Sequence, residues 1–159
     1  MIKKLVYPTV LSLFLASIAP IALAEDSHDN DKTTHITSAV TSPRRKRAMN
    51  ANHYFEVHVK GQPLSALSVE LPELISIEDG IEVTDDDSNQ KIAAKVAIND
   101  QKATLTFALP VASDTTLAIK MKGVDASRLI QKILLYRINI TMADMSEEIS
   151  IGVARINTN

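Results

Sequence analysis

The chain of 159 residues contains no cysteine and no tryptophan, and it has only four glycines. Without cysteine it can form no disulfide, catalytic thiol or thiolate metal site, so a folded domain must be stabilised by burial of apolar surface. The few aromatic residues, three tyrosines and three phenylalanines, argue against a site that stacks sugars on aromatic rings. With so few glycines, the chain has few positions where backbone N–H groups could form a phosphate-binding loop or an oxyanion hole.

Catalytic signatures are also missing from the sequence. It has no G-x-S-x-G, no H-E-x-x-H and no glycine-rich phosphate loop. We therefore predict that the protein is not an enzyme and has no cofactor. The formal net charge of −2 also argues against a nucleic-acid partner, because binding to the phosphate backbone depends on basic side chains.

Residues 1–24 have the order of a secretory signal peptide. A basic start is followed by an apolar stretch over residues 5–19. A signal peptidase site follows, with small residues before a polar one: Ala22, Ala24 and Glu25. The apolar stretch is shorter than the roughly 20 residues of a membrane span, so we expect no transmembrane span in the mature chain. The predicted location is the periplasm, the outer envelope or the medium.

Residues 25–50 are predicted to form a disordered polar and basic linker. They are rich in Asp, Asn, Ser and Thr and show no apolar periodicity. The segment contains one dense basic cluster, made of Arg44, Arg45, Lys46 and Arg47. This basic cluster has three interpretations: an inert solubilising run, a processing-type basic site, or a contact with an anionic envelope surface.

From residue 51 onward the chain shows short segments in which apolar residues alternate with polar ones. This period of two is typical of half-buried strands, and it recurs near residues 55–59, 67–71, 75–77, 81–83, 92–98, 103–109, 117–121, 134–142 and 149–153. Asn99-Asp100 separates two of these segments and predicts a hairpin. We therefore predict an immunoglobulin-like antiparallel β-sandwich of about seven or eight strands over residues 51–159. A small barrel is the alternative, and a short helical turn near 125–131 is left open.

Several strand and turn segments within residues 53–156 resemble a known family. They are His53-Tyr54-Phe55, Pro63-Leu64-Ser65 with Leu67 and Val69, Phe107 with Pro110-Val111, Thr115-Thr116-Leu117, and Ile151-Gly152-Val153-Ala154-Arg155-Ile156. These segments are similar to exported cyanobacterial domains catalogued as domain of unknown function 2808. The resemblance implies a bacterial envelope protein without a known activity. Asp114 stands where the family's turn favours glycine, and Asn157-Thr158-Asn159 replaces an expected final aromatic residue.

One segment resembles the opening of a calcium loop. Asp85, Asp87 and Asn89 have the required spacing, but Gln90 stands where such a loop needs glycine and Val96 where it needs glutamate. We therefore interpret the segment as an acidic hairpin turn and predict no calcium site.

The histidines and methionines give the alternative functions a chemical basis. Imidazole and thioether ligands suit copper, and a periplasmic copper carrier could use His53, His58, Met49, Met142 and Met145. A carbohydrate-binding module is a further alternative. The favoured hypothesis is an exported, non-catalytic, envelope-associated module with an interaction or structural role. Its partner is unknown, with an envelope protein or an anionic envelope surface as the candidates.

Cleavage after Ala24 is the first testable prediction, because Ala22 and Ala24 form the small-residue site. Intact-mass measurement of the exported protein should show a chain that begins at Glu25. Recovery of envelope-bound protein that still carries Met1 would instead show that residues 1–24 act as an anchor.

Overall fold

The computed structural model describes residues 32–42, 51–126 and 133–158. These residues form ten strands and no helix: β1 (His35–Ser42), β2 (Ala51–His58), β3 (Leu64–Glu70), β4 (Ser76–Ile77), β5 (Ile81–Asp85), β6 (Ala94–Asn99), β7 (Lys102–Val111), β8 (Thr116–Asp125), β9 (Ile133–Met142) and β10 (Ile149–Asn157). The part of the chain described here accordingly contains no helix that could cross a bilayer.

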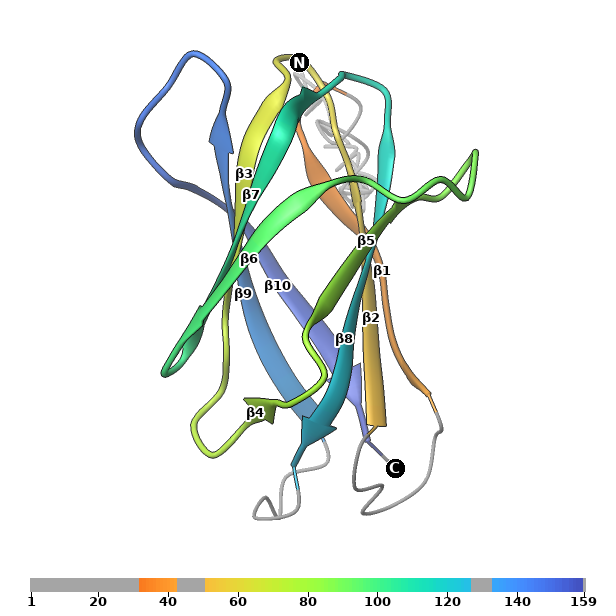
Figure 1. The fold of residues 1–159 in the computed structure, drawn as a ribbon, viewed down its shortest axis with the longest axis vertical. Helices are drawn as coiled ribbons and strands as arrows, with labels where there is room; N and C mark the ends of the chain where they lie inside the picture. Colours follow the sequence, from red (N-terminus) through yellow and green to blue (C-terminus); the bar gives the residue numbers. More distant parts are fainter. Residues whose placement is uncertain (1–31, 43–50, 127–132, 159) are drawn as a thin grey trace, which may run out of the picture.

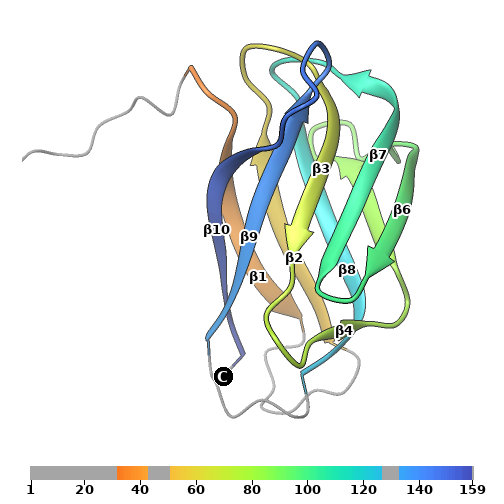
Figure 2. The same ribbon diagram turned by 90° about the vertical axis from the view of Figure 1, so that its left-hand side faces the viewer.

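The strands form two antiparallel sheets that pack face to face (Figures 1 and 2). Sheet I has the order β1-β2-β8, and both β4 and β5 pair with the other side of β8. Sheet II has the order β10-β9-β3-β7-β6. The chain is therefore an immunoglobulin-like β-sandwich, which confirms the predicted fold class over the alternative of a single closed sheet.

Strand alternation builds the core between the two sheets. Successive side chains of a strand point to opposite faces, so each strand offers every second residue to the partner sheet. The inward residues of the long strands are apolar and buried: Phe55, Val57, Leu67, Val69, Leu105, Phe107, Leu117, Ile119, Tyr136 and Ile138. Each Å² of apolar surface that this packing removes from water stabilises the fold by about 25 cal/mol. This burial is the main source of stability in a chain without disulfides.

The predicted hairpin at residues 99–100 is confirmed. Asn99 of β6 pairs with Lys102 of β7, so the loop consists of Asp100 and Gln101. Asp100 adopts a φ of 45°, a left-handed conformation that aspartate tolerates better than most residues. This short loop fixes the register that places Leu105 and Phe107 on the core face.

Gly123 lets β8 continue beyond the end that the sequence predicted. The residue has a φ of 61°, and a Cβ atom there would lie 2.5 Å from the carboxylate of Asp79 and 3.1 Å from its backbone nitrogen. The same close approach allows the amides of Glu78 and Asp79 to donate to the carbonyls of Gly123 and Lys122. Glycine thus joins the β4–β5 connection to β8, which extends to Asp125.

The predicted linker is wrong for its central part, because residues 35–42 form β1. This strand pairs with β2 along its whole length, and Ile36 and Ala39 pack against the core. The composition of the segment suggested that it could not bury enough apolar surface to fold alone. Strand pairing with β2 and this apolar contact stabilise it instead. The remaining parts of the linker, 25–31 and 43–50, lie outside the described residues, as does most of the segment near 125–131.

The strand count is also corrected, from about seven or eight to ten among the described residues. β1 lies before the predicted start of the domain, whereas the alternating segments near residues 75–77 and 81–83 correspond to β4 and β5 as two separate strands. The difference at β1 has a physical cause: it contains only two inward apolar residues, so its alternation is weak in the sequence.

Replacing Phe107 by alanine should lower the free energy of unfolding by about 3–5 kcal/mol, because a large buried side chain would leave a cavity. Thr106 is exposed on the opposite face of β7, and Thr106→Ala is the matched control with an expected change within about 1 kcal/mol. Urea unfolding of both variants measures the difference. Equal small effects would show that the register of β7 is wrong.

Candidate functional site

The residues predicted for signal cleavage and for surface contact lie outside the described part of the chain. These are Ala22, Ala24 and Glu25 at the cleavage site and the basic cluster Arg44, Arg45, Lys46 and Arg47. They stay predictions. Among the described residues, the candidate sites lie on the outer faces and at the ends of the sandwich.

The calcium-like segment is an acidic turn between β5 and β6. A carboxylate oxygen of Asp85 accepts hydrogen bonds from the backbone amides of Asp87 and Ser88, and the amide of Asp85 donates to the carbonyl of Gln90. Asn89 has a φ of 54°. The Asp85 carboxylate thus stabilises the turn itself. Within the described ranges, no three His, Cys, Asp or Glu side chains gather around a common point that could hold a metal ion.

A buried polar pair connects the two sheets inside the core. His53 of β2 and Tyr136 of β9 share a hydrogen bond of 2.7 Å between Nδ1 and the phenol oxygen, and their rings meet edge to face. Each is at most 1% exposed. Burial lowers the pKa of His53 to about 4 and raises the pKa of Tyr136, since desolvation disfavours the charged form of each group. Both side chains are therefore neutral at physiological pH.

The copper set suggested by the sequence is not brought together. His53 points into the core, whereas His58 lies five positions further along β2 on the outer face, about 16 Å away at the usual rise per residue. Met142 lies at the end of β9 in the other sheet, and Met49 is outside the described residues. The alternation that places Phe55 inward was the signal that could have separated the two histidines.

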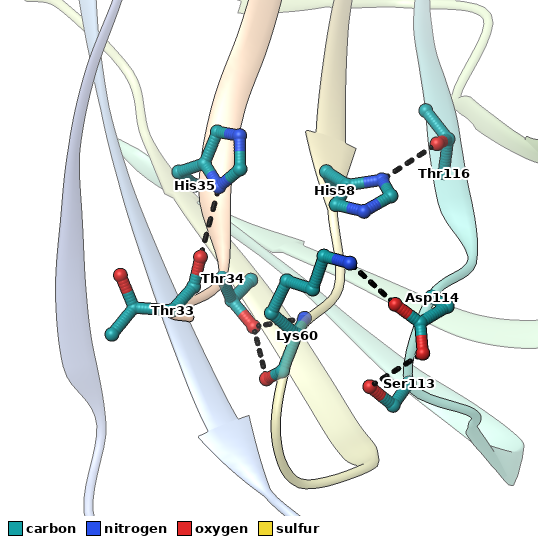
Figure 3. A network of polar contacts seen from close by, with 8 residues as sticks. All are labelled: Thr33, Thr34, His35, His58, Lys60, Ser113, Asp114 and Thr116. Atoms are coloured by element: carbon teal, nitrogen blue, oxygen red, sulfur yellow. Dashed lines mark hydrogen bonds and ion pairs between the residues drawn. The ribbon is translucent and has the colours of Figure 1, made fainter. Parts of the chain in front are cut away.

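The outer face of sheet I carries a cluster of polar side chains near the end of β2 (Figure 3). His35 of β1 pairs in register with His58 of β2, and their ring centroids lie 5.7 Å apart. His35 Nδ1 is 2.8 Å from the carbonyl oxygen of Thr33, and His58 Nδ1 is 2.9 Å from Oγ1 of Thr116 in β8. Sequence reasoning missed this pair because it placed His35 in the linker.

The loop that follows β2 is connected to both neighbouring segments. The Thr34 hydroxyl donates to the carbonyl of Lys60 and accepts from its amide. The ammonium group of Lys60 forms an ion pair with Asp114, and this hydrogen bond and charge lower the pKa of the Asp114 carboxyl. Asp114, which stands at a glycine-favouring turn position, has a φ of 66°. The polar contacts thus fix the start of β1 beside the β7–β8 turn.

Charged and aromatic residues continue along the same outer face. The Lys120 ammonium lies 5.4 Å from the ring centroid of Tyr54, its register partner. Glu82 of β5 faces Lys91 and Lys122, whose hydrogen bond and charges lower the pKa of its carboxyl. Such exposed pairs contribute little to stability, so their significance lies in the pattern of charge they present to a partner.

Shallow apolar hollows lie where the chain passes from β5 in sheet I to β6 in sheet II. One of about 290 Å³ extends from Ile92 to the end of β7, where Leu109 is 80% exposed. Another of about 330 Å³ lies between Val83 and Val96 and shares Ile92 with the first. A hydrogen bond from the amide of Ile92 to the carbonyl of Val83 joins the β5–β6 connection to β5 at this edge.

The outer face of sheet II is partly covered by the β9–β10 connection. Glu148 forms an ion pair of 2.7 Å with Lys102 of β7, although β9 and β3 lie between β10 and β7 in the sheet. The connection must therefore cross this face. Ser68 and Asn139 lie on the same face and are only 2% and 6% exposed.

Comparisons with solved structures give likeness in fold at low sequence identity. The N-terminal domain of the Streptococcus gordonii adhesin Sgo0707 matches with a TM-score of 0.56 and 9% identity, over 81% of this chain and 33% of that one. The major pilin SpaD from Corynebacterium diphtheriae matches with a TM-score of 0.53 and 14% identity, over 78% of this chain and 33% of that one. A putative membrane-anchored protein from the same organism gives a TM-score of 0.51 and 10% identity, over 79% and 34%.

This chain thus spans about a third of the length of each of these three proteins. The sequence matches no protein-family model and no curated protein sequence. At such low identity the likeness shows the fold alone.

Acid should destabilise the domain through His53. Its pKa is about 4 in the folded protein and 6.5 when exposed, so the unfolded state binds the proton first as pH falls. The contribution is fully present above pH 6.5 and is lost between pH 6.5 and 4, with a total loss of about 3 kcal/mol. Urea unfolding across this range measures it.

His58→Gln should leave this pH dependence unchanged, because His58 is on the outer face, whereas His53→Gln should remove it. A proton resonance of the His53 ring that titrates near pH 6.5 in the folded protein would contradict the prediction.

Proposed function

We propose that the protein is an exported, non-catalytic, envelope-associated module that acts by binding rather than by chemistry. The observation that carries the proposal is the two-sheet fold, which resembles domains of a bacterial surface adhesin and a pilin. The described outer faces support it, because they present charge pairs, a cation–π contact and exposed apolar side chains to a partner.

Export is the second part of the proposal and is supported by the predicted signal peptide over residues 1–24. An oxidising compartment commonly favours disulfides, but this domain has none and is stabilised by its apolar core. The relation to the exported domains of unknown function 2808 remains a prediction from sequence resemblance. A location at the cell envelope is consistent with both features.

The basic cluster provides a means of attachment to an anionic surface. Arg44, Arg45, Lys46 and Arg47 lie between β1 and β2 in the sequence. Each base near an anionic lipid surface contributes about 1 kcal/mol, so four give weak and reversible binding. Since the predicted signal peptide contains two lysines, its removal lowers the formal charge of the chain from −2 to −4. The basic cluster therefore opposes an otherwise acidic protein.

Sedimentation of the purified protein with isolated envelopes tests the attachment. Replacement of all four bases by serine should reduce pelleting at least tenfold, and added salt should do the same to the wild type, because the screening length at 0.15 M is about 8 Å. A variant that changes the three arginines to lysine keeps every charge and should pellet like the wild type.

Two outcomes separate the parts of the proposal. In the first outcome, wild type and serine variant pellet equally, salt has no effect, and protease treatment of the envelopes abolishes pelleting. This result would show that the basic cluster does not contribute to attachment and that the domain binds a protein partner. Absence of saturable pelleting for every variant would overturn envelope association itself.

A further inference from the structure

Two histidine rings stand next to one another on the outer face of sheet I. His35 and His58 are direct register partners on β1 and β2, their centroids lie 5.7 Å apart, and the ring planes are inclined at 52° (Figure 3). Both residues are half-buried, so the rings border solvent. We propose that this pair binds a divalent transition-metal ion, with Cu²⁺ bound most tightly.

The hydrogen bond of His35 leaves its Nε2 atom available as a metal ligand. A carbonyl oxygen only accepts hydrogen bonds, so the 2.8 Å contact with Thr33 requires that Nδ1 of His35 carries the proton. In the neutral ring the lone pair is then on Nε2. Metal-binding histidines generally have this arrangement, in which the second ring nitrogen donates to a carbonyl or carboxylate and fixes the tautomer.

The separation of the rings suits a shared ion. A metal–nitrogen bond of about 2 Å places the ion about 3 Å from each ring centre, so two rings on one ion have centres up to about 6 Å apart. The observed 5.7 Å falls within this limit. In Figure 3 the two Nε2 atoms do not point at each other, so binding turns the His58 ring and breaks its hydrogen bond to Thr116. The half-buried Thr116 hydroxyl can then bond to water.

The donor set determines the class of ion. Imidazole nitrogens suit zinc, copper and nickel, whereas Mg²⁺ and Ca²⁺ prefer oxygen ligands. Affinity for nitrogen ligands rises along the first-row divalent ions to Cu²⁺, so copper should bind more tightly than nickel or zinc. Water would complete the coordination, because no third His, Cys, Asp or Glu of the described chain joins the pair.

The site also has a structural consequence. β1 is an edge strand of sheet I, and its pairing with β2 brings the two histidines into register. An ion that binds both rings binds the paired strands better than the unfolded chain, so it stabilises the edge of the sheet. In a protein without disulfides, the ion would act as a link between the two strands.

Calorimetric titration of the full chain with Cu²⁺, Ni²⁺, Zn²⁺ and Mg²⁺ tests the proposal. We expect one Cu²⁺ per chain at this site and no binding of Mg²⁺. His35→Asn and His58→Asn should each weaken Cu²⁺ binding at least tenfold, and the double variant should lose the same site and no other. His28→Asn is the matched control, because it removes an imidazole outside the pair, and it should leave the affinity unchanged.

Two further measurements make the result decisive. Ni²⁺ should raise the melting temperature of the wild type and of His28→Asn but not of the pair variants, and Cu²⁺ should broaden the ring proton resonances of His35 and His58. If an asparagine variant melts at a lower temperature without metal, glutamine replaces it in the same series. Binding that survives loss of His35, or that disappears with His28, would overturn the proposal.

Discussion

Apolar contact between the two sheets is the interaction on which this domain depends, because the chain has no cysteine to link them covalently. The inward side chains of β2 and β8 meet those of β3, β7 and β9. The hydrogen bond between His53 and Tyr136 crosses this apolar layer and satisfies a polar atom of each side chain. An unpaired buried polar group would cost about 1–3 kcal/mol, so the pair also favours one mutual placement of the sheets.

Strand alternation commits the inner faces to packing and leaves recognition to the outer faces and the edges. The outer face of sheet I combines residues that are distant in the sequence, since β1, β2 and β8 lie side by side. His35, His58 and Thr116 meet there although more than 80 positions separate the first from the last. The outer face of sheet II is more closed, because the ion pair between Lys102 and Glu148 holds a connection across it.

The sequence was informative where a strand has several inward apolar residues. Leu105 and Phe107 alternate clearly, and the hairpin before them follows from Asn99 and Asp100, so this part of the fold was predicted. β1 was missed because it depends on its neighbour for stability, which is a tertiary effect that local composition does not record. The histidine pair was missed for the same reason, since His35 has a register partner only once β1 is known to pair with β2.

The direction of the outermost strands determines how the domain responds to mechanical load. Figures 1 and 2 show that β1 begins at one end of the long axis and that β10 ends at the other. Tension applied through these two points runs along the strands, perpendicular to the hydrogen bonds that join β1 to β2 and β10 to β9. Rupture then requires many bonds to shear together rather than to open one after another. The same number of bonds therefore resists pulling along this axis better than peeling of either edge strand.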